Sequence, residues 1–538
     1  MSPSAPKNPP WLPTSPSEFG QLKSHWKGDL LSGFLVFLLA LPLSLGIARA
    51  SGFPAAMGVL TAIVGGIVTP IFRVSPLTIK GPAAGLITVC SGAFLEFGGE
   101  QFWPMVTAAV LVAAALQWVL ALARLGTLSD LFPPSAVHGM LAAIGIIIIS
   151  KQIPVLLGVE PQLYAGKAPL VLLSEIPAFV RAARPEPALL GVLSMVLLFG
   201  YPLIQRGWLK NVPAPMWVLA LSIPGALLLN FRAEQPPYIL VHIGDFWGAM
   251  GLHIDFSLAG QWVFWKYVFM FLFVNSLESL LTVKAIDAMD PLKRTSDYNA
   301  DLFGLGTGNF IAALLGGLPM ISEVVRSSAN VGFGARTKAA NFFHGLFLLL
   351  SMLFLIPVIE LIPNASLAAL LIFAGYRLAS PRQFGRALGI GRAHLLVLLV
   401  TIAVTLVEDL LLGVASGIVL KLLLNWAMGA KPGGFFKLNF AFHREGGIQR
   451  LEIRSTVQFT HLVALKKVLA QANPAIPLHI DLTPCDFADH CFVSFVLEYC
   501  ARARSEGRDV QLLGLSEMKP RSRHPEAVHV RVKHRDAG

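Results

Sequence analysis

Residues 316–332 have the sequence GGLPMISEVVRSSANVG. This stretch places Glu323 and Arg326 three residues apart, just after a Gly-Gly-x-Pro break, and hydrophobic segments lie on both sides of it. A charge at the centre of a bilayer costs at least about 3 kcal/mol, so an ionisable side chain at that depth is a functional candidate by default. The role of these two residues, at a break between apolar segments, therefore bears on both the fold and the function.

The composition is that of a polytopic membrane protein. Of the 538 residues, 55% are hydrophobic and only 14% are charged, whereas a soluble domain has about 25% charged residues. The formal net charge is +11, but the basic residues are spread through loops and chain ends. Positive loops on the cytoplasmic side of a membrane explain this distribution, so we expect the lipid bilayer and no nucleic acid as a partner.

Fourteen apolar segments follow one another along the chain, and a polar stretch at residues 232–260 divides them into two sets of seven. A full helical span needs about 20 residues. The first repeat, about residues 30–231, has segments near 30–50, 54–72, 82–97, 104–124, 131–153, 187–205 and 213–231. The second repeat, about residues 262–428, has segments near 262–288, 299–317, 321–333, 339–361, 365–378, 393–409 and 411–428.

The third segment of each set is unusually short. In the first set it follows VSPLTIKGP, and in the second it lies within the GGLP stretch. Short, Gly/Pro-interrupted segments at matching positions of two halves indicate the binding site of an inverted-repeat transporter. Two half-helices would direct their N-terminal N–H groups, each end carrying roughly half a positive charge, at one point where a small anion would bind.

The parts outside the predicted transmembrane transporter domain, residues 26–430, are more polar. Residues 1–25, rich in Pro and Ser, predict a disordered cytosolic tail, and residues 431–450 predict a linker. Alternating strand and helix patterns over residues 451–518 predict a small cytosolic α/β domain, and residues 519–538 predict a disordered basic tail. The spacing of the cysteines does not match a metal site, so we expect ordinary buried thiols at Cys90, Cys485, Cys491 and Cys500.

Several motifs together resemble the SulP family, the sulfate-permease-type anion transporters that include plant sulfate transporters and animal pendrin and prestin. The first apolar segment contains LALPLSLGIARASGFP, and VSPLTIKGPAAG includes the Gly-Pro start of the third. The eighth contains VNSLESLLTV, and the tenth and its following loop contain VVRSSANVGFGARTK. The C-terminal α/β unit resembles the family's STAS domain. The resemblance covers roughly residues 25–515.

The resemblance implies a fold of seven plus seven transmembrane helices in an inverted repeat. In that fold a core domain moves against a gate domain, and the anion lies between helices one, three, eight and ten. A homodimer is also implied. The SLESLL and RSSAN sequences are most similar to a bacterial branch often encoded beside or fused to carbonic anhydrase. That similarity suggests bicarbonate as the substrate and a functional association with carbonic anhydrase.

Glu278 lies in the middle of the apolar segment FMFLFVNSLESLLTVKA. A desolvated carboxyl there would bind and release a proton, or it would stay ionised and hold Na⁺ together with Thr282, one turn later on the same helical face. A buried acid that only packs helices is the structural alternative. The resemblance implies an ion-coupling acid at this position, and it leaves both H⁺ and Na⁺ open.

Arg326 and Glu323 have opposite expected effects on an anion. Arg326 would raise the positive potential at the half-helix without titrating, and the resemblance implies an Arg at this place. Glu323 departs from the family pattern, where the residue is often small or apolar. It would weaken anion binding unless it pairs with Arg326, holds a proton or holds a cation; Glu323 is therefore also an ion-coupling candidate.

Lys80, directly before Gly81, is another departure from the family pattern. Its long side chain would either snorkel to an interface or attract the anion. Small residues after it would offer backbone N–H groups, and small residues of the first helix would line the same cavity or pack helices closely. The substrate-binding candidates are Gly81, Ala83, Ala84, Gly85, Ser322, Glu323, Val324, Arg326, Pro42 and Ser44.

These observations predict a secondary active transporter of a small inorganic anion, working by alternating access in the inner membrane with both termini in the cytoplasm. Bicarbonate is the first candidate, symported with Na⁺ or H⁺, and sulfate or a dicarboxylate comes next. The alternatives from other classes are an uncoupled anion channel and a membrane sensor, and a nucleobase permease is a closer structural alternative. No hydrolytic or redox constellation is present, so we predict no enzyme activity and no cofactor besides the coupling ion.

Overall fold

The computed structural model describes residues 16–99, 103–126, 132–165, 167–204, 212–231, 239–243, 246–408 and 410–531. Its contacts divide the chain into two compact units, which are described separately. The first unit consists of residues 1–126 and 144–378, and the second consists of residues 127–143 and 379–538. The expected tail at residues 1–15 lies outside the described residues.

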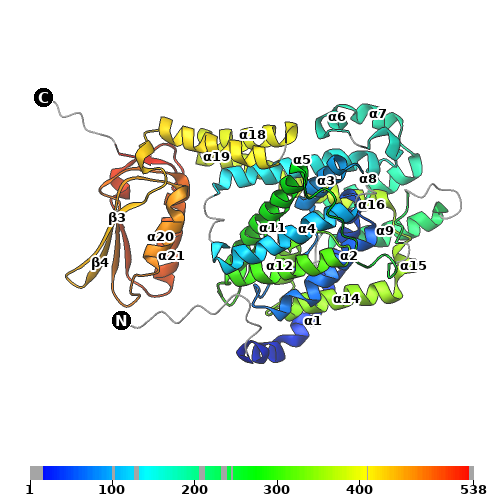
Figure 1. The fold of residues 1–538 in the computed structure, drawn as a ribbon, viewed down its shortest axis with the longest axis horizontal. Coiled ribbons are helices and arrows are strands. Elements are labelled where there is room, and N and C mark those ends of the chain that lie inside the picture. Colours follow the sequence, from blue (N-terminus) through cyan, green and yellow to red (C-terminus); the bar gives the residue numbers. More distant parts are fainter. Residues whose placement is uncertain are drawn as a thin grey trace. The chain divides into compact units, whose positions relative to one another are not determined.

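A helix lies at each of the fourteen expected apolar segments, and Figure 1 labels most of these helices. In the first repeat these are α1 (Pro16–Ala50), α2 (Ala55–Ile67), α3 (Ile87–Phe97), α4 (Trp103–Leu122), α5 (Pro134–Leu156), α8 (Pro185–Ile204) and α9 (Ala214–Leu228). In the second repeat they are α11 (Trp262–Met289), α12 (Tyr298–Leu314), α13 (Val324–Gly332), α14 (Ala339–Phe354), α16 (Asn364–Leu378), α18 (Arg392–Val407) and α19 (Leu410–Ala427). Short helices connect them: α6 (Pro169–Ser174), α7 (Ile176–Arg181), α15 (Ile356–Ile359) and α17 (Pro381–Ile390).

Helix length separates these elements into two kinds. Within the described residues, six helices are long and apolar enough to cross a membrane: α1, α4, α5, α8, α11 and α19. In contrast, α3 has 11 residues and α13 has 9, far fewer than the roughly 20 that a full span needs. The two expected half-helices are therefore short in the structure as well.

Each short helix is preceded by an extended segment, and the two segments pair. Strand β1 (Lys80–Gly81) lies antiparallel to strand β2 (Ile321–Ser322), with Lys80 opposite Ser322. The pairing satisfies backbone groups that no helix can satisfy, which is the condition for non-helical backbone inside a membrane. The Gly/Pro-containing breaks before α3 and α13 thus form one small two-stranded junction within the first unit.

Glycines of α2 let its neighbours approach closely. A methyl group on Gly65 would lie 2.7 Å from the Lys80 carbonyl oxygen, and one on Gly66 would lie 2.5 Å from Gly345 Cα on α14. A side chain at Gly58 would meet the backbone of α1 at Ser44. Helices in membranes associate through this kind of small-residue packing, so α2 holds α1, β1 and α14 together.

The start of α1 is bound to the loop that precedes α14. The buried Asp29 carboxylate accepts hydrogen bonds from the backbone N–H groups of Arg336 and Thr337, at 2.8 and 3.1 Å, and from the Thr337 hydroxyl at 2.5 Å. Within the GARTK sequence of that loop, the Thr337 hydroxyl thus has a defined partner. The predicted disordered tail, residues 1–25, is wrong in part, because α1 begins at Pro16; proline is favoured at the first position of a helix.

The second unit contains a seven-stranded sheet with strand order β7-β5-β4-β6-β9-β8, and β3 pairs with β4 beside this path. The central pairs β4–β5, β4–β6 and β5–β7 are parallel, and the remaining pairs are antiparallel. The strands are β3 (Asn439–Glu445), β4 (Ile448–Val457), β5 (Leu478–Asp481), β6 (Cys485–Ala488), β7 (Val510–Leu513), β8 (Lys519–Pro520) and β9 (His529–Val530). Helices α20 (Leu462–Leu469) and α21 (His490–Ser505) pack against this sheet.

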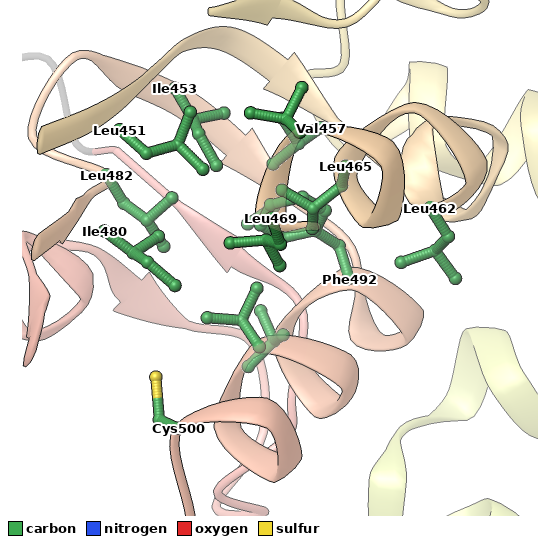
Figure 2. Packing of buried hydrophobic residues seen from close by; sticks show 14 of the residues in the cluster. Leu451, Ile453, Val457, Leu462, Leu465, Leu469, Ile480, Leu482, Phe492 and Cys500 are labelled. Atoms are coloured by element: carbon green, nitrogen blue, oxygen red, sulfur yellow. The ribbon is translucent and has the colours of Figure 1, made fainter. Parts of the chain in front are cut away.

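Apolar side chains from the sheet and both helices form one core, shown in Figure 2. Leu451 and Ile453 point from β4 toward Leu469 of α20 and Phe492 of α21. The cysteines belong to this core: burial raises the pKa of the Cys485 thiol to about 12 and raises the pKa of Cys500 as well. Because the thiolate is the reactive form, these residues are inert packing groups, as expected from the sequence.

The structure differs from the sequence prediction at both ends of this domain. The predicted linker, residues 431–450, contains β3, which returns to β4 through Gly446 and Gly447, both at positive φ (56° and 80°). The predicted disordered tail, residues 519–538, contributes β8 and β9. Strands of two residues are too short to show periodicity in a sequence. They form by pairing, β9 with β6 and β8 with β9. Residues 532–538 lie outside the described residues.

The packing of α2 gives a first prediction. Gly66→Ala is expected to destabilise the first unit by about 1–3 kcal/mol, because the added methyl group would lie 2.5 Å from Gly345 Cα. The measurement is the midpoint of thermal unfolding of the detergent-solubilised protein, followed by size-exclusion chromatography. Gly385→Ala in α17 is the matched control, since nothing lies within 4 Å of its added methyl group. An unchanged midpoint for Gly66→Ala would contradict the close approach of α2 and α14.

A pair of glycines in the second unit gives a second prediction. Gly507 and Gly514 have nearly the same positive φ, 78° and 79°, but a methyl group on Gly514 would collide with the backbone at Thr483, whereas nothing lies near Gly507. Both alanine variants should lose about 1–2 kcal/mol through the left-handed backbone, and Gly514→Ala should lose more. Thiol labelling of Cys485 and Cys500 during heating measures the opening of this unit. Equal labelling of the two variants would show that the Thr483 contact contributes nothing.

Candidate functional site

The junction of β1 and β2 brings the starts of α3 and α13 together. The backbone N–H of Ile79 donates to Ser327 Oγ at 2.9 Å, and the Glu323 N–H donates to the Ile79 carbonyl at 3.0 Å. On the α11 side, the Ser322 N–H donates to Ser279 Oγ at 3.1 Å. The two breaks that were far apart in the sequence therefore share one hydrogen-bonded centre.

Arg326 is the central side chain of this junction and is fully buried. Its Nη2 donates to the Pro82 carbonyl oxygen at 3.1 Å, so the guanidinium reaches from α13 to the segment before α3. A methyl group on Gly81 would lie 2.7 Å from Nη1, which is why the position beside the guanidinium has no side chain. Among the described residues, Nε and Nη1 have no hydrogen-bond acceptor. A buried charge normally has its donors satisfied, so these N–H groups are suited to a ligand.

Glu323 caps the helix that carries Arg326. Its Oε2 accepts a hydrogen bond from the Arg326 backbone N–H at 2.6 Å, and the same oxygen lies 4.0 Å from Arg326 Nε. The expected ion pair is thus present but long, and the shorter contact is to the backbone. An acid at the N-terminus of a helix satisfies an otherwise unpaired N–H group and reduces the local positive potential. Glu323 therefore fixes α13 and lowers the net charge near the guanidinium.

Glu278 and Thr282 lie one turn apart on α11, and both are buried. A methyl group on Gly85 would collide with the Glu278 carboxylate, so this carboxylate lies directly against the segment that begins α3. Within the described part of the chain, Glu278 Oε1 has no hydrogen-bond donor. A buried carboxylate oxygen without a protein partner can take up a proton or contribute to a cation site.

The Lys80 side chain neither snorkels to an interface nor faces an anion, the two alternatives expected from the sequence. It is fully buried, and its Nζ donates to Asp301 Oδ1 at 2.6 Å, to Ser322 Oγ at 2.5 Å and to Thr78 Oγ1 at 2.9 Å. Snorkelling to an interface is therefore wrong, and the cation is neutralised by α12 instead of facing an anion. Removing one partner of such a buried pair leaves an uncompensated charge, which typically costs about 3–5 kcal/mol. Asp301 lies 221 residues away, so local spacing gives no signal of the pair.

A cavity of about 250 Å³ adjoins the junction. Ala84, Glu323 and Arg326 line it on one side. The opposite lining comes from α1, α8, the start of α9, and α16, and includes residues that sequence reasoning did not single out, among them Tyr201, Phe373 and Arg377. Tyr201 donates from its hydroxyl to the Val212 carbonyl at 2.5 Å. No motif in the sequence connects α16 with the two breaks, because the cavity forms only by tertiary packing.

The charged residues of this lining are two cations and one acid, Arg326, Arg377 and Glu323. Their formal net charge is +1, in surroundings that are otherwise mostly apolar. Electrostatic attraction is strengthened in such a site because little water screens it. The arrangement can hold a small anion of one negative charge with little excess charge left over.

The predicted binding residues divide into three groups. Ala84, Glu323 and Arg326 line the cavity directly. A second group lies buried in the junction or in α1 beside it: Gly81, Ala83, Gly85, Ser322, Pro42 and Ser44. Ser44 Oγ has no hydrogen-bond partner among the described residues. Val324, at the first position of α13, has a side chain that is 47% exposed and does not line the cavity.

Comparison with known proteins places the chain among anion transporters. A sequence model of the Sulfate permease family matches residues 26–401. The chain is 26% identical over 401 residues to the putative sulfate transporter YvdB of Bacillus subtilis, which covers 73% of this chain and 72% of that protein. It is 22% identical over 405 residues to the bicarbonate transporter BicA of Picosynechococcus sp., which covers 73% of this chain and 69% of BicA.

Two solved structures have the same fold. The transmembrane domain of a cyanobacterium bicarbonate transporter BicA superimposes with a TM-score of 0.63 and 22% identity, over 73% of this chain and 97% of that domain. The structure of SLC26A9 gives a TM-score of 0.68 with 15% identity, over 92% of this chain and 85% of SLC26A9. At these identities the likeness shows the fold, a helical membrane domain followed by a sheet-containing domain. Since the family model also covers most of the chain, the protein belongs to the sulfate permease family of anion transporters.

Proposed function

We propose that the protein is a secondary active transporter of bicarbonate that works by alternating access, with the anion at Arg326 and the coupling ion at Glu278. The observation that carries the proposal is the fully buried guanidinium whose Nε and Nη1 have no acceptor among the described residues and which lines a cavity of about 250 Å³. A planar guanidinium binds planar oxyanions through paired N–H···O contacts. A cavity of this size has room for such an anion and some of its water.

The charge of the lining favours a monovalent anion. Arg326 and Arg377 contribute two positive charges, and Glu323 removes one of them. Bicarbonate would be neutralised by the remaining charge, whereas sulfate would carry a second charge into surroundings where an uncompensated charge costs several kcal/mol. Bicarbonate is also the transported ion in the name of the relative BicA. Sulfate is the second candidate, because the relative YvdB is named a putative sulfate transporter.

Glu278 would couple transport to a cation. Its carboxylate lies against Gly85 at the start of α3 and has an oxygen without a protein donor in the described residues. Binding of H⁺, or of Na⁺ with help from Thr282, would neutralise this charge while the anion is bound. The anion and the cation would then cross together, because moving either buried charge alone costs more than moving the pair.

We also propose a cellular location, an oligomeric state and a partner for the protein. We expect the protein in the inner membrane with both termini in the cytoplasm, acting as a homodimer, with a C-terminal domain of the STAS type that regulates or assembles the transporter. Carbonic anhydrase is a proposed functional partner, since it interconverts bicarbonate and CO₂. Both tests use native membranes without detergent. Chemical crosslinking tests for the dimer, and protease accessibility shows on which side of the membrane the termini lie.

Glu278→Gln tests the coupling. In proteoliposomes with an imposed Na⁺ or H⁺ gradient, the wild type should accumulate labelled bicarbonate under one of the two gradients. The glutamine variant keeps the size of the side chain but cannot ionise, so its uptake should no longer respond to that gradient. Glu186→Gln at the exposed start of α8 is the matched control, and its uptake should equal the wild type.

Other outcomes of the same assay are equally informative. Absence of bicarbonate uptake under both gradients would remove the substrate proposal, and sulfate and fumarate would be tested next. Equal uptake by wild type and Glu278→Gln under every gradient would remove the coupling role. Wild-type flux that ignores both gradients would favour the anion channel.

Arg326→Gln tests the anion site. Loss of the charged hydrogen bonds is expected to weaken anion binding by about 2 kcal/mol, roughly thirtyfold in KM. Arg326→Lys should keep part of the affinity because the charge remains but the fork of donors is lost. KM for uptake and the thermal stabilisation by added anion both measure the effect, with Arg382→Gln on the exposed face of α17 as the control. An unchanged KM in Arg326→Gln would place the anion elsewhere.

A further inference from the structure

A second and larger cavity, of about 760 Å³, lies in the first unit at the C-terminal end of α1. Three cations line it: Arg49 of α1, Lys151 of α5 and Lys167 of the loop before α6. Among the described residues, its lining contains neither Asp nor Glu. We call this cavity the vestibule. Its charge is therefore positive, and a positively lined hollow with low-dielectric walls concentrates small anions.

Lys151 is the cation that best fits an anion-binding role. Its Nζ donates to the neutral Ser91 Oγ of α3 at 2.6 Å, and no carboxylate of the described residues lies within ion-pair distance of it. Lys167 differs, because its Nζ is paired with Glu175 at 2.6 Å. A partly buried ammonium held only by a hydroxyl retains donors for an anion, whereas the paired lysine is already neutralised.

The vestibule and the cavity at Arg326 follow each other along α1. Leu39, Leu43 and Ile47 line the Arg326 cavity, while Gly46, Arg49 and Ala50 line the vestibule. Leu371 of α16 lines both cavities. A methyl group on Gly46 would lie 3.4 Å from Leu371 Cδ1, so α1 and α16 are in contact at this level. Leu371 therefore borders both cavities at the level of Gly46.

Cations near the end of a helix also stabilise it, because the last carbonyl groups carry a partial negative charge. Arg49 lies in the last turn of α1, and Lys151 lies near the end of α5. Stabilisation of helix ends, however, requires neither a large cavity nor a lining free of acids. The two roles also differ in what they predict: a helix-end cation affects folding, whereas a binding cation affects the concentration of anion needed for transport.

We propose that Lys151 forms a capture site for the transported small inorganic anion, separate from the site at Arg326. The capture site rests on the proposed function, since it serves passage to the Arg326 cavity. The anion enters the vestibule, is held by Lys151 Nζ, and passes to Arg326 when α16 moves Leu371 away from Gly46. The vestibule raises the local anion concentration at one face of the transporter only.

The experiment compares KM for anion uptake from the two sides, in intact cells and in inverted membrane vesicles from the same cells. Lys151→Gln should raise KM roughly tenfold from the side that the vestibule faces, leave KM from the other side unchanged and keep the maximal rate. Lys167→Gln is the matched control: it lines the same cavity but is paired with Glu175, and its KM should change less than about twofold.

The outcomes separate this proposal from the one it rests on. If the wild type transports neither bicarbonate nor sulfate, the proposed function fails. If the wild type transports and Lys151→Gln leaves KM unchanged from both sides, or lowers only the maximal rate equally from both, the capture site is overturned and Lys151 stabilises the end of α5. If Lys151→Gln fails to reach the membrane, the wild-type protein provides the test. Its KM for uptake should rise with ionic strength from one side of the membrane only. Equal sensitivity of KM to ionic strength on both sides would overturn the proposal.

Discussion

The pairing of β1 with β2 is the constraint on which the rest of the first unit depends. Inside a membrane, non-helical backbone is stable only where other protein groups satisfy it, and here each extended segment satisfies the other. The pairing places the starts of α3 and α13 side by side, so Arg326 can reach the Pro82 carbonyl and Glu278 can lie against Gly85. The small residues of α2 then become necessary, because a side chain at Gly65 would push β1 out of this position.

Two buried cations near this junction have different partners, and the difference supports the proposed anion site at Arg326. Lys80 is surrounded by Asp301, Ser322 and Thr78, so its charge is used to hold β1 against α12 and β2. The Arg326 guanidinium donates one hydrogen bond, to the Pro82 carbonyl. The Glu323 carboxylate accepts its short hydrogen bond from the Arg326 backbone N–H and lies 4.0 Å from the guanidinium Nε. The positive charge that remains available for a ligand is therefore that of Arg326, although both residues interrupt apolar sequence in the same way.

Sequence reasoning found the features that are local in the chain. Periodicity and length located the apolar segments, and glycine and proline breaks located the two half-helices. Each of these signals lies within about 20 residues of sequence. It did not find Asp301 as the partner of Lys80, Leu371 and Arg377 as lining residues, or β9 as a partner of β6. Each of these depends on packing between segments far apart in sequence, where no spacing rule applies. The hairpin through Gly446 and Gly447 was within reach, since a Gly-Gly pair between alternating residues predicts one.

The arrangement of the two cavities along α1 limits how large the transport movement has to be. Leu43 lines the Arg326 cavity and Arg49 lines the vestibule, and six residues of helix correspond to about 9 Å. In the proposed mechanism, an anion that moves between the two sites therefore travels a short distance, past Leu371, which borders both cavities. Because packed side chains tend to have discrete arrangements, we propose that a small shift of α16 against α1 opens this path. Movement of one leucine side chain in this way requires no helix to unfold.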